Sequence, residues 1–149
     1  MPSTISTLVI DDDVTATRLV TARLRERFPA MAIDTTSSPA HAGDYDIYVF
    51  GTDFDGVPLG LSLARTLRHD RPKALIIATS DNYDGDLLKA LLNAGCNGAC
   101  DKGSPDDLDT LLELVGAHVE KIGGRRDGIT GVLRSMTNLL REWNQPFDR

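Results

Sequence analysis

The hydrophobic residues of this chain fall into short runs, separated by longer stretches in which apolar positions recur every three or four residues. Five short runs have the length and composition of buried β-strands: residues 6–10, 31–35, 47–50, 74–78 and 98–101. The longer stretches predict amphipathic helices at 14–28, 58–69, 84–94 and 105–122, with a much shorter one at 36–43. In the first helix the predicted buried stripe comprises Val14, Leu19, Val20, Leu24 and Phe28. This alternation predicts an α/β protein with a doubly wound, five-stranded parallel sheet.

The last part of the chain carries a further apolar pattern beyond the predicted sheet. Seven apolar residues recur at helical spacing: Ile129, Val132, Leu133, Met136, Leu139, Leu140 and Trp143. They predict a C-terminal amphipathic helix over residues 127–144, separate from a first domain over residues 5–122. Gly123-Gly124 is expected to break the chain between the two. The apolar face must be buried, either on the first domain or in a homodimer, and we expect the homodimer.

The composition of the chain indicates which partners and which cellular compartment to expect. The formal net charge of −6 argues against nucleic acid, because binding to phosphates needs a basic surface. No apolar run is long enough for a membrane span, and the N-terminus lacks the pattern of a signal peptide. Cys96 and Cys100 have no neighbouring histidine and do not form a zinc motif, so we read them as small packed residues in a reducing cytoplasm.

Polar and charged residues follow several of the predicted strands. Asp11 and Asp12 end the first strand, Asp53 follows the third, Thr79 ends the fourth and Lys102 follows the fifth. In a parallel sheet these positions meet at one edge, where α/β proteins bind their ligands. Two carboxylates suit Mg²⁺, and a hydroxyl with an ammonium group suits phosphate oxygens. The sequence therefore predicts a phosphoryl site with Mg²⁺ on Asp11 and Asp12, although a capped helix start would also explain the acidic run.

The order and spacing of these motifs resemble the receiver domain of two-component response regulators, the CheY-like superfamily. The resemblance covers roughly residues 5–118 and rests on four segments: Leu8 to Asp12, Tyr45 to Phe50, Ala74 to Thr79 and Gly98 to Pro105. It implies a flavodoxin-like receiver fold and a role in phosphorelay signal transduction. It also implies support of the phosphate by Thr79 and Lys102, and a protein partner, either a sensor kinase or a downstream signalling protein.

The chain departs from the family at the phosphoacceptor. Counting from Tyr45-Asp46, the acceptor position falls on Gly51, which has no side chain, and the nearest acid, Asp53, is the phosphoacceptor candidate. The family's aromatic switch position is Ala99, which cannot report occupancy of the site. We therefore expect an atypical receiver that acts through protein contacts and is not an enzyme, with Mg²⁺ weak or absent.

A phosphatase is the alternative that the sequence leaves open. Asp11-Asp12-Asp13-Val14-Thr15 also fits the Asp-x-Asp-x-Thr pattern of haloacid-dehalogenase-like phosphatases, in which Asp11 would be the nucleophile and Mg²⁺ the cofactor. The acidic triplet runs straight into a predicted helix, without the glycine-rich turn and hairpin that this family needs.

Overall fold

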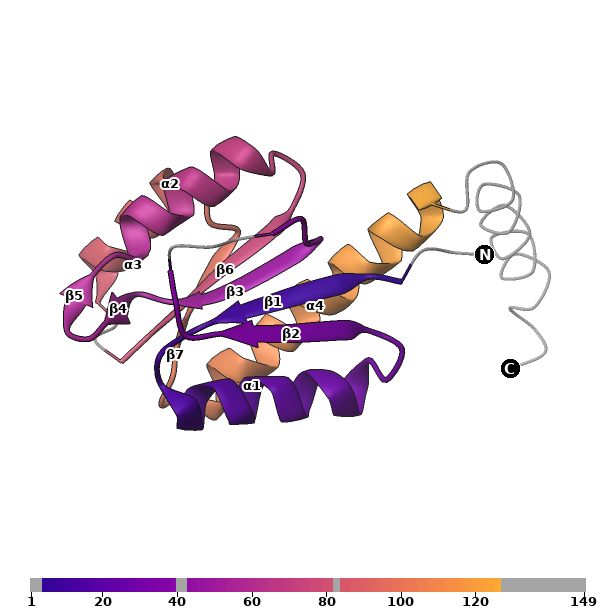
Figure 1. Cartoon of the computed structure of the whole chain (residues 1–149), viewed down its shortest axis with the longest axis horizontal. Helices are drawn as coiled ribbons and strands as arrows, with labels where there is room; N and C mark the ends of the chain where they lie inside the picture. Colours follow the sequence, from indigo (N-terminus) through magenta and orange to yellow (C-terminus); the bar gives the residue numbers. More distant parts are fainter. Residues whose placement is uncertain (1–3, 40–42, 82–83, 127–149) are drawn as a thin grey trace, which may run out of the picture. The chain divides into compact units, whose positions relative to one another are not determined.

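A five-stranded parallel sheet forms the centre of residues 4–115 (Figure 1). The computed structural model describes residues 4–39, 43–81 and 84–126. The sheet has the strand order β2-β1-β3-β6-β7 and consists of β1 (Ser6–Ile10), β2 (Ala32–Thr36), β3 (Ile47–Gly51), β6 (Leu75–Ser80) and β7 (Gly98–Asp101). All four pairings in it are parallel. The predicted fold class is therefore confirmed, and each predicted strand lies within one or two residues of the observed one.

The core lies on the central strands. All residues of β3 and β6 are buried, which explains why their sequences are continuous apolar runs rather than alternating ones. The edge strand β2, in contrast, has no fully buried residue. The carboxyl ends of the buried strands therefore form one edge of the sheet, at which the residues that follow each strand lie.

Helices cover both faces of the sheet: α1 (Val14–Arg27) and the first turns of α4 (Pro105–Arg126) on one, α2 (Gly60–Asp70) and α3 (Gly85–Asn93) on the other (Figure 1). The side chain of Asp13 caps α1 by accepting a hydrogen bond from the Ala16 N–H. The predicted stripe on α1 is only partly buried. Val20 and Leu24 pack in the core, whereas Val14 and Leu19 are 61% and 46% exposed.

Three local features differ from the prediction. The described residues between β2 and β3 contain no helix, so the short helix at 36–43 is not observed there. The loop expected after β3 forms a two-stranded hairpin, β4 (Asp53–Phe54) with β5 (Val57–Pro58), turning at Asp55-Gly56 with positive φ at both residues. Gly123-Gly124 does not break the chain, because α4 continues through both glycines to Arg126.

The chain divides into two compact units. One comprises residues 4–115 and holds the whole sheet; the other comprises residues 1–3 and 116–149. The predicted domain end at 122 therefore falls inside α4, and the predicted amphipathic helix at 127–144 lies outside the described residues. In the described part of the chain, no helix combines the length and apolarity that crossing a membrane requires.

Candidate functional site

The sheet register brings the predicted site residues to one edge. Gly51, the last residue of β3, is paired with Thr79 of β6, and Asp11 follows the last residue of β1. Lys102 follows β7, and its backbone N–H donates to the carbonyl of Ser80. Asp11, Thr79 and Lys102 of the predicted set therefore lie at the carboxyl rim of the sheet, together with Gly51.

An ion pair between Asp11 and Lys102 forms the centre of the site. The Lys102 Nζ lies 2.9 Å from one carboxylate oxygen of Asp11 and 3.2 Å from the other. Both side chains are largely withdrawn from water, with 4% of Asp11 and 11% of Lys102 exposed. The backbone N–H of Asp13 donates a further hydrogen bond to Asp11, at 3.0 Å. The carboxylate of Asp11 is thus satisfied by groups of the protein itself.

Burial and charge act in opposite directions on this pair. Burial raises the pKa of Asp11, and the hydrogen bonds from Lys102 and Asp13 offset only part of that effect. Burial alone would lower the pKa of Lys102, but the hydrogen bond and charge of Asp11, with the charges of Asp81 and Asp13, raise it overall. Both shifts favour the protonated form, which is neutral for Asp11 and charged for Lys102. The two residues form an ion pair, because two contacts of about 3 Å join the charged ammonium group to the carboxylate.

The missing side chain of Gly51 is what makes room for Asp11. A Cβ atom built on Gly51 would lie 2.7 Å, 2.8 Å and 2.9 Å from the three carboxyl atoms of Asp11. Real Cβ atoms essentially never approach another heavy atom within 3.0 Å, so any larger residue at 51 would make the end of the Asp11 side chain shift from its contacts with Lys102 and Asp13. The Asp11 carboxylate therefore occupies the space into which a side chain at position 51 would project.

The other aspartates of the site have separate structural partners. Asp12 accepts a hydrogen bond of 2.7 Å from the backbone N–H of Asp55, which ties the end of β1 to the tip of the β4–β5 hairpin. Asp13 caps α1, and its second oxygen lies 3.7 Å from the Lys102 Nζ. Asp53, the phosphoacceptor candidate, begins β4 opposite Pro58 and is half-buried.

The hydroxyl groups of the rim are turned into the protein. Thr79 donates to the backbone carbonyl of Phe50 at 3.3 Å and is buried, so its hydroxyl is used within the sheet. Thr52 and Ser80 are also buried and form a hydrogen bond of 2.9 Å to each other. Sequence reasoning missed the contact between Thr52 and Ser80. The signal in the sequence was that hydroxyl residues lie at the ends of two strands that are neighbours in the sheet, Thr52 after β3 and Ser80 at the end of β6.

The donor set fits a divalent cation poorly. Mg²⁺ needs carboxylate oxygens with free lone pairs in near-octahedral geometry. Here the Asp11 carboxylate is paired with an ammonium group, and one oxygen of Asp12 is held by a backbone N–H. Within residues 4–39, 43–81 and 84–126, no three His, Cys, Asp or Glu side chains are grouped so that they could hold a metal ion.

Comparison with known proteins places the fold. No family model and no curated protein matches the chain. Among solved structures, it is similar to the BeF3-activated receiver domain of DrrB, with TM-score 0.68 and 17% identity over 79% of this chain and 99% of that one. A CheY-like receiver domain protein from Methanospirillum hungatei gives TM-score 0.67 and 17% identity, covering 80% and 97%. The chain has the receiver fold.

A further solved structure of this fold contains a phosphorylated aspartate. It is a response regulator protein from Burkholderia pseudomallei with a phosphorylated aspartic acid, a calcium ion and citrate. It has TM-score 0.61 and 17% identity, covering 78% of this chain and 72% of that one. At 17% identity the similarity establishes only the fold of this chain, and its chemistry has to be argued from its own residues.

Proposed function

We propose that this chain is an atypical receiver module in two-component phosphorelay signalling, which acts through protein contacts rather than through an aspartyl phosphate. The observation that carries the proposal is the Asp11 carboxylate in the space beside Gly51, paired with Lys102. A phosphoryl group on a receiver needs an acceptor carboxylate and a free ammonium group beside it. In this chain the acceptor side chain is missing, and the ammonium group is already paired.

The same site supports weak or absent binding of Mg²⁺. A cation would have to displace the Lys102 ammonium from Asp11 and the Asp55 N–H from Asp12. A ligand that binds only the folded state raises the melting temperature of the protein. Because we expect Mg²⁺ to bind weakly or not at all, about 10 mM Mg²⁺ should leave the melting temperature unchanged. A clear rise that Asp12→Asn abolishes would show that the acidic residues do bind the cation.

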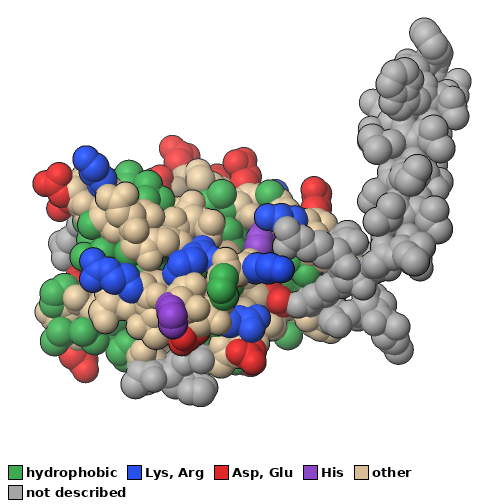
Figure 2. Space-filling model, turned by 90° about the horizontal axis from the view of Figure 1, so that it is seen from above, with side chains coloured by type: hydrophobic (Ala, Val, Ile, Leu, Met, Phe, Trp, Pro, Cys, Tyr) green, Lys and Arg blue, Asp and Glu red, His purple; other side chains and the backbone are tan. Residues whose placement is uncertain are grey.

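The partners follow from the fold and the sequence. We propose a cytoplasmic protein that contacts a sensor kinase or a downstream signalling protein, without nucleic acid, and that forms a homodimer through residues 127–144. Residues 4–115 carry 18 acidic and ten basic side chains, which opposes binding to phosphates, and the face in Figure 2 shows acidic side chains as well as basic ones. The phosphatase alternative has no specific support, because its nucleophile, Asp11, is buried and held by Lys102. Absence of turnover of a phosphate monoester with Mg²⁺ is expected.

The deciding experiment is incubation of the full chain with acetyl phosphate and Mg²⁺, followed by intact mass measurement. We expect no phosphate adduct, while a conventional receiver treated in parallel is modified. Asp53→Asn and the matched control Asp55→Asn are carried through the same assay. A stoichiometric adduct that Asp53→Asn removes and Asp55→Asn retains would overturn the proposal and make Asp53 the phosphoacceptor.

A further inference from the structure

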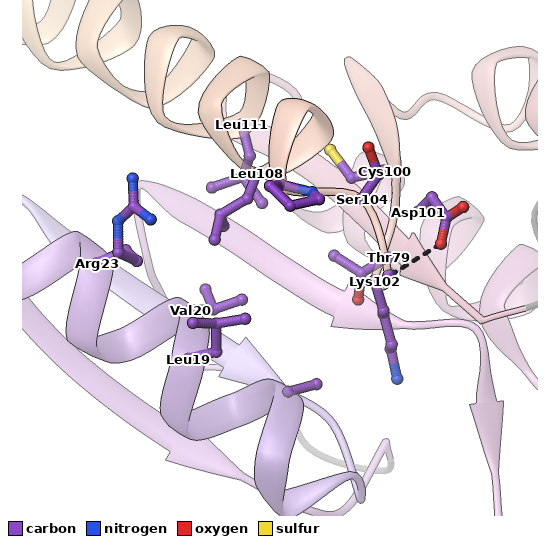
Figure 3. A pocket seen from close by; sticks show the side chains of 13 residues that line it. Leu19, Val20, Arg23, Thr79, Cys100, Asp101, Lys102, Ser104, Leu108 and Leu111 are labelled. Atoms are coloured by element: carbon purple, nitrogen blue, oxygen red, sulfur yellow. Dashed lines mark hydrogen bonds between the residues drawn. The ribbon is translucent and has the colours of Figure 1, made fainter.

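An apolar groove lies beside the proposed site in the residue 4–115 unit, and two residues of that site, Thr79 and Lys102, contribute to its lining. It is a cavity of about 300 Å³ between α1 and the first turns of α4. Leu19 and Val20 of α1 face Leu108 and Leu111 of α4 across it, and the amine of Lys102 points away from them (Figure 3). Leu19 is 46% exposed, which is high for a large apolar side chain that lines a cavity. We call this feature the α1–α4 groove.

Charge around the groove indicates what would fit it. Asp106 and Asp109 lie exposed on the first turns of α4, and Asp101 lines the groove. Arg23 of α1 lines the groove as well, but its guanidinium is paired with Asp109 at 3.2 Å. The whole of residues 4–115 carries 18 acidic and ten basic side chains, a net charge of −8. A fitting occupant is therefore apolar on one face and basic beside it.

The chain itself contains a segment with this chemistry. Residues 129–143 combine seven apolar positions at helical spacing with Arg134 and Arg141 off that stripe. With Glu142 counted, residues 129–143 carry two basic side chains and one acidic side chain, a net charge of +1, opposite in sign to residues 4–115. Apolar pattern and charge therefore both match the α1–α4 groove.

We propose that residues 129–143 of a second copy of this chain occupy the α1–α4 groove. This inference rests on the homodimer of the proposed function and specifies its contact. In a two-fold arrangement each segment covers the partner's groove, so both apolar surfaces are buried in one closed assembly. Such a contact is of the helix-in-groove type, in which side chains at three- and four-residue steps anchor the helix.

The test uses the full-length protein and two matched leucine variants. Leu19→Asp places a charge in the groove, and Leu92→Asp places the same charge on α3, where the native leucine is 45% exposed. Both native side chains are already accessible, so neither variant is expected to unfold the protein. Sedimentation equilibrium measures the oligomeric state, and the fluorescence of Trp143, the one tryptophan of the chain, reports burial of the segment.

We expect a wild-type dimer with blue-shifted emission, a Leu92→Asp variant like wild type, and a Leu19→Asp variant that is monomeric with red-shifted emission. A wild-type protein that is monomeric with buried Trp143 would overturn the proposal in favour of packing within one chain. A Leu19→Asp variant that stays dimeric would overturn the groove contact while the homodimer stands. Neither outcome bears on phosphorylation, which the acetyl phosphate assay tests separately.

Discussion

Removing the cation of the buried ion pair tests the physical basis of the site most directly. The variant Lys102→Met keeps the length of the side chain and leaves the Asp11 carboxylate, 4% exposed, without its positive partner. Removing one member of a buried pair costs about 3–5 kcal/mol. For a domain of this size each kcal/mol lowers the melting temperature by about 4 °C, so we expect a drop of about 12–20 °C.

The partner variants separate pairing from packing. Asp11→Asn should cost less, about 1–3 kcal/mol, because the Lys102 ammonium keeps some access to water and lies 3.7 Å from Asp13. In the double variant Asp11→Asn with Lys102→Met no charge is left uncompensated. The double variant should therefore be more stable than the sum of the single effects implies, and the difference measures the coupling of the pair.

The pH dependence of Lys102→Met gives an independent check. Burial already raises the pKa of Asp11, and Lys102 opposes that rise, so removing the lysine raises the pKa further. The folded variant then binds a proton more tightly than the unfolded chain, and its stability increases as pH falls through the raised pKa. Urea unfolding at about pH 7 and pH 5 should show a smaller deficit at the lower pH. A deficit below about 1 kcal/mol at neutral pH, typical of an exposed pair, would refute the reasoning.

Three further predictions concern other parts of the structure. Arg68→Ala should destabilise the protein by about 2–4 kcal/mol in urea unfolding, because the Arg68 guanidinium donates hydrogen bonds to the backbone carbonyls of Pro72, Ala74 and Gly95. Arg68→Lys should recover little of this loss, because an ammonium group lacks the planar, forked donor geometry of a guanidinium. Gly51→Ala should cost about 1–3 kcal/mol by displacing the Asp11 carboxylate, and no loss would contradict the crowding. Burial raises the pKa of Cys96 to about 12 and of Cys100 to about 11, so a thiol reagent should react slowly with native protein at neutral pH and rapidly in urea.

The strands were predictable because their signal is local. A buried strand such as β3 is an uninterrupted apolar run, and a run of that kind leaves few alternatives. The Asp55-Gly56 turn was visible for the same reason, since both residues tolerate positive φ. The two strands of the β4–β5 hairpin were not predictable, because each has only two residues, which is too few to show a periodic pattern.

The errors have physical causes that the sequence does not show. Gly123-Gly124 weakens a helix by about 1 kcal/mol per residue, but α4 continues because such a local preference can be outweighed by its surroundings. Leu19 fits a buried stripe by spacing and is exposed because it lies on the rim of a groove. The meeting of Asp11 and Lys102 followed from strand order, whereas the filling of the space beside Gly51 depends on a side-chain position in three dimensions.

The crowding at Gly51 also opposes the introduction of an acceptor side chain at this position. A single exchange to aspartate at this position would place a second carboxylate in the volume that Asp11 already fills, next to one ammonium group. Both the overlap and the like charges would oppose it. An acceptor at position 51 therefore requires Asp11 to move at the same time as residue 51 changes. For the proposed function this means that one substitution at position 51 would not by itself create a receiver that accepts a phosphoryl group.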